Sequence, residues 1–160
     1  MKTTAIYPGT FDPITHGHTD ITVRATQLFE KIIIAVAEST IKKTVFSIEE
    51  RVEMAKKVLA GYENVEVCSF NELVTAFARK KNATVIIRGL RAVSDFEYEF
   101  QMASMNRQLS DQIETVFLTP SEHLGYISSG LVREVASLGG DVSKFVHKDV
   151  MNALQKRLVK

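Results

Sequence analysis

The sequence predicts an α/β fold, a doubly wound five-stranded parallel sheet with helices on both faces. Short runs rich in β-branched residues alternate with longer segments of helical periodicity, which is typical of parallel strands joined by right-handed crossovers. The apolar cores of these runs are nearly continuous, as expected for strands covered on both faces. The expected strands are Thr3–Tyr7, Lys31–Ala37, Val65–Ser69, Thr84–Arg88 and Glu114–Leu118.

Helical periodicity fills the segments between these strands. One apolar face recurs at i, i+4, i+7 and i+11 through Ile48, Val52, Ala55 and Leu59. Ser47 followed by Glu50 is the pattern of a capping box at the start of that helix. A second helix carries Val93, Phe96, Phe100 and Ala103, with a similar Ser94 and Glu97 pair. Further helices are expected over Gly17–Leu28, Leu73–Lys80, Gly130–Ser137 and Asp149–Lys160.

Composition excludes several classes of protein. The 160 residues fit one domain over 1–160, and 45% hydrophobic with 24% charged residues is an ordinary globular balance. A net charge of +1 argues against a nucleic-acid binder, which needs a concentrated basic surface. The longest apolar run, Ile32–Ala37, is too short to cross a membrane. Without a signal region, and with a single cysteine, Cys68, the chain is expected in the cytoplasm.

The loop after the first strand carries the densest group of functional residue types. In doubly wound sheets, ligands bind beyond the carboxyl ends of the strands. Gly9 permits close approach of the backbone to a ligand, and the first amides of the following helix favour an anion. His18 is placed to donate to a bound phosphate. The alternative is a turn in which His16 and His18 are merely tolerated at the surface.

Three later loops add cations and hydroxyl groups at the same edge. Lys42 follows the second strand. Arg88 and Arg91 flank a short turn after the fourth strand and suit bidentate phosphate recognition. The alternative for Arg88 is an ion pair with a neighbouring carboxylate such as Asp95. Ser128 and Ser129 precede the helix after the fifth strand, where capping and phosphate binding are compatible. Together the loops predict a polyphosphate site.

No Cys/His cluster has zinc spacing, so no protein-held metal is expected.

The sequence resembles the phosphopantetheine adenylyltransferase family over essentially its whole length. The resemblance is carried by the Thr15-His16-Gly17-His18 signature, by the stretch from Tyr7 to Thr15, and by Ile87 to Glu99 with its Arg-Gly-Leu-Arg turn. Ile127-Ser128-Ser129, followed by the stretch from Leu131 to Ala136, completes it. Members of this family transfer the adenylyl group of ATP to 4′-phosphopantetheine, which gives dephospho-coenzyme A and pyrophosphate.

The resemblance implies a role for individual residues. His18, Lys42 and Arg91 would act in catalysis, and Thr10, Lys42, Val74 and Arg88 would bind phosphopantetheine. The residues expected to hold ATP are Gly9, Thr10, Phe11, His18, Gly89, Leu90, Arg91, Glu99, Leu124, Gly125, Tyr126, Ile127, Ser128, Ser129 and Gly130. It also implies Mg²⁺ carried mainly by the ATP phosphates, a homohexamer, and feedback inhibition by coenzyme A.

The sequence departs from the family pattern at three sites. Gly130 stands where a serine or threonine is usual, Leu124-Gly125-Tyr126 replaces an aromatic-Ser-aromatic stretch, and Val74 is smaller than the usual aliphatic residue. None of these changes removes a charged group. Two alternatives stay open from the residues themselves: a nucleotidyltransferase with another phosphate acceptor, and a non-catalytic regulator that binds adenine nucleotides.

Overall fold

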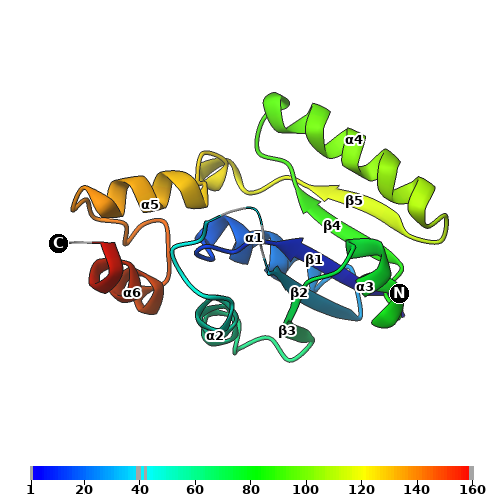
Figure 1. The fold of residues 1–160 in the computed structure, drawn as a ribbon, viewed down its shortest axis with the longest axis horizontal. Coiled ribbons are helices and arrows are strands. Elements are labelled where there is room, and N and C mark those ends of the chain that lie inside the picture. Colours follow the sequence, from blue (N-terminus) through cyan, green and yellow to red (C-terminus); the bar gives the residue numbers. More distant parts are fainter. Residues whose placement is uncertain (1, 39–40, 42, 159–160) are drawn as a thin grey trace.

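A five-stranded parallel sheet forms the centre of the molecule (Figure 1). The computed structural model describes residues 2–38, 41 and 43–158. Its strands are β1 (Thr4–Gly9), β2 (Lys31–Ala37), β3 (Val65–Phe70), β4 (Val85–Gly89) and β5 (Glu114–Leu118). They lie in the order β3-β2-β1-β4-β5, and each neighbouring pair is parallel. The predicted α/β class is confirmed. β1 runs on to Gly9, beyond its predicted end at Tyr7.

The helices also follow the predicted pattern. They are α1 (His16–Ala25), α2 (Ile48–Val58), α3 (Val74–Lys80), α4 (Val93–Leu109), α5 (Ser129–Ser137) and α6 (Lys148–Leu158), with a 3-10 turn η1 (Glu122–Leu124) that was not predicted. The capping box of Ser47 and Glu50 at α2 is confirmed. The one predicted at Ser94 is wrong, because α4 begins at Val93 and Ala92 takes the cap position.

Alternate residues of the inner strands enter two separate cores. Tyr7, Ile34 and Ile87 pack with α1, α2, α5 and α6, whereas Ile6 and Ile33 face the other side, where α3 packs. All of these sheet residues are at most 5% exposed. Burial on both faces explains why the strands read as continuous apolar runs.

The strand order reverses between β1 and β4, where a ligand crevice is expected. The chain leaves β1 through α1 toward β2 on one side, while β4 lies on the other side. The loops after β1 and β4 and the start of α5 meet beyond this point (Figure 1).

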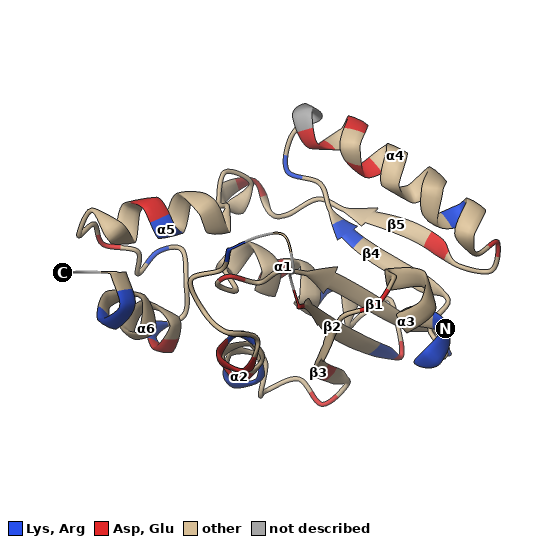
Figure 2. Cartoon of the chain, in the orientation of Figure 1, with Lys and Arg blue, Asp and Glu red and all other residues tan. Residues whose placement is uncertain are grey.

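Charged residues of both signs are interspersed on α2, α5 and α6, whereas much of α4 carries neither (Figure 2).

Within residues 2–38, 41 and 43–158, no helix has the length and apolar content needed to cross a membrane.

Candidate active site

A cavity of about 390 Å³ opens beyond the carboxyl ends of β1 and β4. The loop after β1, the first turn of α1, the end of β4 and the first turn of α5 supply its walls. The predicted site residues that line it are Gly9, Thr10, Phe11, His18, Arg88, Gly89, Arg91, Glu99, Leu124, Ile127, Ser128, Ser129 and Gly130. Loops distant in sequence are therefore brought together, as the strand pattern predicts.

Four predicted residues do not line this cavity. Leu90 continues the sheet, since its backbone N–H donates to the Leu118 carbonyl at 3.0 Å. Gly125 follows η1, and the exposed Tyr126 ring packs edge-on against Phe145. Val74 lines a second cavity, considered below. Their contacts with substrates stay predictions.

The loop after β2 also reaches the cavity. Lys42, predicted to act in catalysis and in acceptor binding, lies outside the described residues. Its neighbours Lys43 and Thr44 line the cavity wall. This loop therefore joins the site at the edge predicted from the strand order.

His18 is held by a capping box at the start of α1. The backbone N–H of Thr15 donates to Nδ1 of His18 at 3.0 Å, and the backbone N–H of His18 donates to Oγ1 of Thr15 at 3.4 Å. An Nδ1 that accepts a hydrogen bond carries no proton, so the neutral ring bears its proton on Nε2. His18 therefore presents an N–H donor on the side of the ring away from the cap.

The surroundings of His18 keep its ring neutral. Burial, together with the positive charges of Arg91 and Arg88, lowers the pKa of His18 to about 4. The site therefore offers a hydrogen-bond donor without an added positive charge at neutral pH.

Aromatic contacts hold the His18 ring in position. The Phe11 ring lies edge-on to it, with 4.8 Å between ring centroids, and Tyr7 lies edge-on to Phe11 at 5.4 Å. Phe11 adopts a φ of 50°, which an L-residue rarely takes. Gly9 permits this turn, because a β-carbon there would lie 3.0 Å from Cε2 of Phe11.

Arg88 is bound on its inner side by protein groups. Nε and Nη2 donate to the two carboxylate oxygens of Glu99 at 2.8 and 2.6 Å, and Nη1 donates to the Pro8 carbonyl at 2.9 Å. The alternative of an ion pair with a neighbouring carboxylate is confirmed, but the partner is Glu99, because Asp95 lies 3.6 Å from Nε of Arg91 instead. A guanidinium has five N–H groups, so Arg88 keeps donors for an anion in the cavity.

The start of α5 contributes polar groups to the opposite wall. Oγ of Ser128 accepts from the Leu131 backbone N–H at 3.1 Å, so the predicted cap is confirmed and its hydroxyl hydrogen stays available. Ser129 donates its hydroxyl to the Pro13 carbonyl at 2.8 Å. Arg91 reaches across from the β4 end and donates to the Ile127 carbonyl at 3.2 Å.

Arg133 is a cation of the cavity that the sequence analysis did not single out. Nη1 donates to the Asp12 carbonyl at 2.6 Å and lies 3.8 Å from the Asp12 carboxylate. A β-carbon at Gly130 would lie 3.8 Å from Nη2 of Arg133. The guanidinium therefore lies beside the position that lacks the usual hydroxyl. The available signal was its spacing, one helical turn after Ser129.

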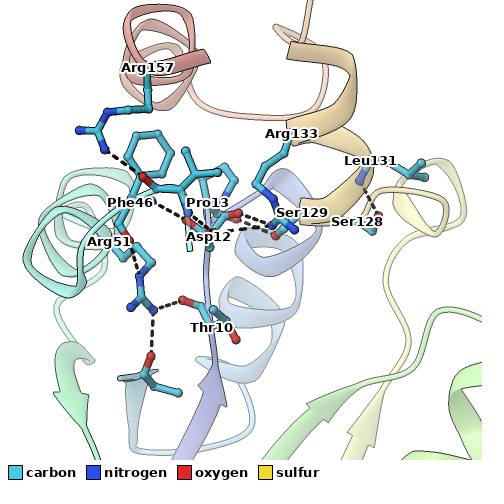
Figure 3. A network of polar contacts seen from close by, with 12 residues as sticks. Thr10, Asp12, Pro13, Phe46, Arg51, Ser128, Ser129, Leu131, Arg133 and Arg157 are labelled. Atoms are coloured by element: carbon cyan, nitrogen blue, oxygen red, sulfur yellow. Dashed lines mark hydrogen bonds and ion pairs between the residues drawn. The ribbon is translucent and has the colours of Figure 1, made fainter. Parts of the chain in front are cut away.

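A buried polar network connects the walls of the site (Figure 3). The carboxylate of Asp12 accepts from the backbone N–H groups of Val45 and Phe46 at 2.9 and 3.0 Å. Arg51, 3% exposed, donates to the carbonyls of Thr10 and Ala37, both at 2.8 Å, and of Phe46 at 3.2 Å. Arg51 thereby fixes the corner after β1 relative to the end of β2 and the start of α2.

A second cavity of about 270 Å³ adjoins the first. The two cavities share Pro8, Gly9, Thr10, Arg88 and Glu99. Beyond these shared residues, the second cavity is lined mainly by apolar side chains, among them Phe70, Val74, Ile86 and Met102. A cationic residue, Arg88, therefore lies where a polar and a more apolar compartment meet.

Replacing Arg51 should destabilise the fold. Arg51→Met removes the donor to three buried backbone carbonyls, so we expect a loss of about 2–4 kcal/mol in the free energy of unfolding, measured by urea denaturation. Arg79→Met replaces an exposed arginine and should change it by no more than about 0.5 kcal/mol. Equal losses in the two variants would contradict the role given to Arg51.

The lowered pKa of His18 makes stability depend on pH. An unfolded histidine titrates near about 6.5, and folded His18 near about 4. The stability contributed by the neutral His18 ring is therefore fully present above the pKa of the unfolded histidine. It is lost as the pH falls toward the pKa of folded His18. The loss in unfolding free energy is at most about 1.4 kcal/mol per pH unit. Glutamine does not titrate, so the unfolding free energy of wild type minus that of His18→Gln should decrease from pH 7 to pH 4.5. A difference that stays constant over this range would disprove the shift.

Known proteins resemble this chain in sequence over most of its length. A family model described as cytidylyltransferase-like matches residues 6–135. The chain is 61% identical to the phosphopantetheine adenylyltransferase of Nitrosomonas eutropha (strain DSM 101675 / C91 / Nm57), over 96% of this chain and 94% of the relative. It is 56% identical to that of Thioalkalivibrio sulfidiphilus (strain HL-EbGR7), over 99% of each.

Solved structures of more distant proteins share the fold. The putative nicotinate-nucleotide adenylyltransferase of Vibrio parahaemolyticus has a TM-score of 0.73 at 17% identity, covering 97% of this chain and 99% of that one. The Plasmodium falciparum nicotinic acid mononucleotide adenylyltransferase complexed with NaAD has a TM-score of 0.71 at 14% identity, covering 98% and 96%. The high-identity relatives decide the family: the chain belongs to the phosphopantetheine adenylyltransferases.

Proposed function

We propose that this chain transfers the adenylyl group of ATP to 4′-phosphopantetheine and releases dephospho-coenzyme A and pyrophosphate. The observation that carries the proposal is the position of Arg88 between the two cavities. From there its free N–H groups bind the phosphate of an acceptor whose arm lies in the second cavity. The first cavity holds the triphosphate against His18, Arg91 and the start of α5.

The chemistry requires positioning and charge stabilisation rather than a protein base. The nucleophile is an oxygen of the acceptor phosphate, which is anionic near neutral pH. It attacks the α-phosphorus of ATP, a new P–O bond forms, and the bond to the pyrophosphate oxygen breaks. Such transfers depend on in-line placement and on stabilising charge at the phosphoryl oxygens. Nε2–H of His18 supplies a preorganised donor for these oxygens.

The pyrophosphate leaves toward the opposite wall of the first cavity. The first amides of α5, the Ser128 hydroxyl, Arg91 and Arg133 surround that space. A helix N-terminus favours an anion through its free N–H groups and its dipole. Together these groups stabilise the charge that builds up as pyrophosphate departs.

Magnesium enters as part of the nucleotide substrate. Within the described residues, no group of three or more His, Cys, Asp or Glu side chains is placed to hold a metal ion. Carboxylates of the cavity already have partners: Glu99 pairs with Arg88, and Asp12 accepts from two backbone N–H groups. Mg²⁺ commonly binds substrate phosphates and water with few protein ligands. We therefore assign to Glu99 the orientation of Arg88, in place of the contact with ATP that the sequence predicts.

Assembly and regulation follow the family expectation. Large apolar side chains on α4 are roughly half exposed or more, which is typical of an interaction surface; they are Phe96, Tyr98, Phe100, Met105 and Leu109. We propose that they contact other copies of the chain in a homohexamer, each copy acting as a single domain.

Coenzyme A, which contains both the adenosine and the pantetheine parts, would inhibit by occupying both cavities. The cytoplasmic location stays a prediction.

A pyrophosphate-release assay over a panel of phosphate acceptors separates this proposal from its rivals. Phosphopantetheine should be used far better than nicotinamide mononucleotide or glycerol phosphate. Preference for another acceptor would indicate a different nucleotidyltransferase. ATP binding without pyrophosphate release for any acceptor would indicate a non-catalytic regulator.

Removing the His18 donor should lower turnover. We expect kcat of His18→Ala to fall by roughly 10²–10³-fold, the scale seen when one transition-state donor is removed. The matched control is His123→Ala, since His123 is exposed and lies outside the cavity lining. Turnover of His18→Ala close to wild type in the steady-state assay would contradict the assignment.

A further inference from the structure

The segment that follows β5 is tied to the rest of the protein through α1. Asp20 accepts two hydrogen bonds from Ser121, one from its backbone N–H at 3.0 Å and one from its hydroxyl at 2.8 Å. Arg24, one turn later on α1, donates to the Thr119 carbonyl, and its Nε lies 3.4 Å from Oδ2 of Asp20. Within the part of the chain that the structure describes, every hydrogen bond from residues 119–124 to another element goes to this helix.

Ser121 begins the turn that leads to one wall of the first cavity. It takes the cap position of η1, and its carbonyl accepts from the Leu124 backbone N–H at 2.8 Å. The Leu124 carbonyl accepts in turn from the Ile127 backbone N–H at 3.1 Å. Pro120, Leu124 and Ile127 line the cavity, and we call these three residues the base wall. A chain of short contacts therefore runs from Asp20 to the base wall.

The base wall suits the base of a nucleotide and not its phosphates. Its three residues are apolar, whereas the cations that line the cavity come from other segments. Pockets for ring systems are mostly apolar, with a few polar groups that fix orientation. Ile127 is followed directly by Ser128 at the start of α5, where the triphosphate binds under the proposed function. A base against this wall is therefore continuous with a triphosphate at α5.

The helix that holds the base wall also carries the phosphoryl donor. His18 lies on α1, two residues before Asp20. A β-carbon at Gly17 would lie 3.9 Å from the Leu124 carbonyl oxygen, so η1 packs directly on the first turn of this helix. ATP spans both regions, with its base at the wall and its phosphates near His18. The placement of the reacting phosphorus therefore depends on the contacts that fix the wall to α1, and misplacement by about 1 Å is costly in such reactions.

We propose that Asp20 is a positioning residue, which acts through Ser121 to hold the base wall in register with His18. The inference rests on the proposed function and gives a role to a carboxylate outside the cavity lining. Hydrogen bonds to an ionised acceptor are roughly twice as strong as neutral ones, and Asp20 accepts two from one residue. The base is an unreacting part of ATP, so loss of the contact should appear chiefly in the affinity for ATP.

The test compares two ligands, ATP and inorganic tripolyphosphate, which carries the phosphates but no base. Each is titrated with Mg²⁺ into the protein by calorimetry. Asp20→Ala should weaken ATP binding on the order of 10-fold and leave tripolyphosphate binding nearly unchanged. Asp20→Asn keeps the shape of the side chain without its charge, so its ATP affinity should lie between those of wild type and Asp20→Ala. Glu122→Gln removes an exposed carboxylate from the same turn and is the matched control, which should bind both ligands as wild type does.

A second variant tests whether Asp20 acts through Ser121. Ser121→Ala removes the hydroxyl donor but keeps the backbone N–H, so it should weaken ATP binding less than Asp20→Ala does. In the Asp20→Ala background the same change should cause no further loss, because the partner of the hydroxyl is already absent. Additive losses in the double variant would contradict the path through Ser121.

The outcomes separate this inference from the proposed function. If wild type binds ATP but releases no pyrophosphate with phosphopantetheine, the proposed function fails. If wild type is active, two results would overturn the inference alone: equal weakening of ATP and tripolyphosphate in Asp20→Ala, or an unchanged affinity for ATP. Should Asp20→Ala not fold, Asp20→Asn and Ser121→Ala decide by the same comparison of the two ligands.

Discussion

The hydrogen bond from the Thr15 backbone N–H to Nδ1 of His18 is the contact on which the rest of the site depends. It caps α1 and at the same time determines which ring nitrogen carries the proton. Burial and two neighbouring arginines keep the ring neutral, so the donor at Nε2 is present before any substrate arrives. Preorganised donors of this kind lower the barrier because they need no reorientation during the reaction.

The surrounding loops are shaped to keep this donor in place. Phe11 takes an unfavourable φ to set its ring against His18, and Arg51 holds the carbonyl of the preceding Thr10. Arg51 and the carboxylate of Asp12 satisfy backbone groups that would otherwise be unpaired in the interior. Irregular backbone is costly to bury without such partners. The network therefore allows the irregular loop after β1 to lie buried beneath the site with its backbone groups satisfied.

Much of this arrangement follows from the sequence, and the remainder depends on contacts between distant segments. Continuous apolar runs predict the parallel sheet, and its carboxyl edge places His18, Arg88 and Ser128 together. Local periodicity cannot tell which carboxylate meets Arg88: Asp95 is near in sequence, yet Glu99 on the inward face of α4 is its partner. Arg133 was missed for the same reason, since its significance comes from the cavity that it lines. Motif spacing identifies the phosphate loops but not the side chains that complete them.

The position of the proton on the His18 ring can be measured in the free protein. Nitrogen-15 NMR of the uniformly labelled chain at pH 7 distinguishes protonated from unprotonated ring nitrogens, and the His18→Gln variant assigns the signals. We predict a neutral ring with its proton on Nε2 and none on Nδ1. A proton on Nδ1, or an imidazolium ring at this pH, would contradict it.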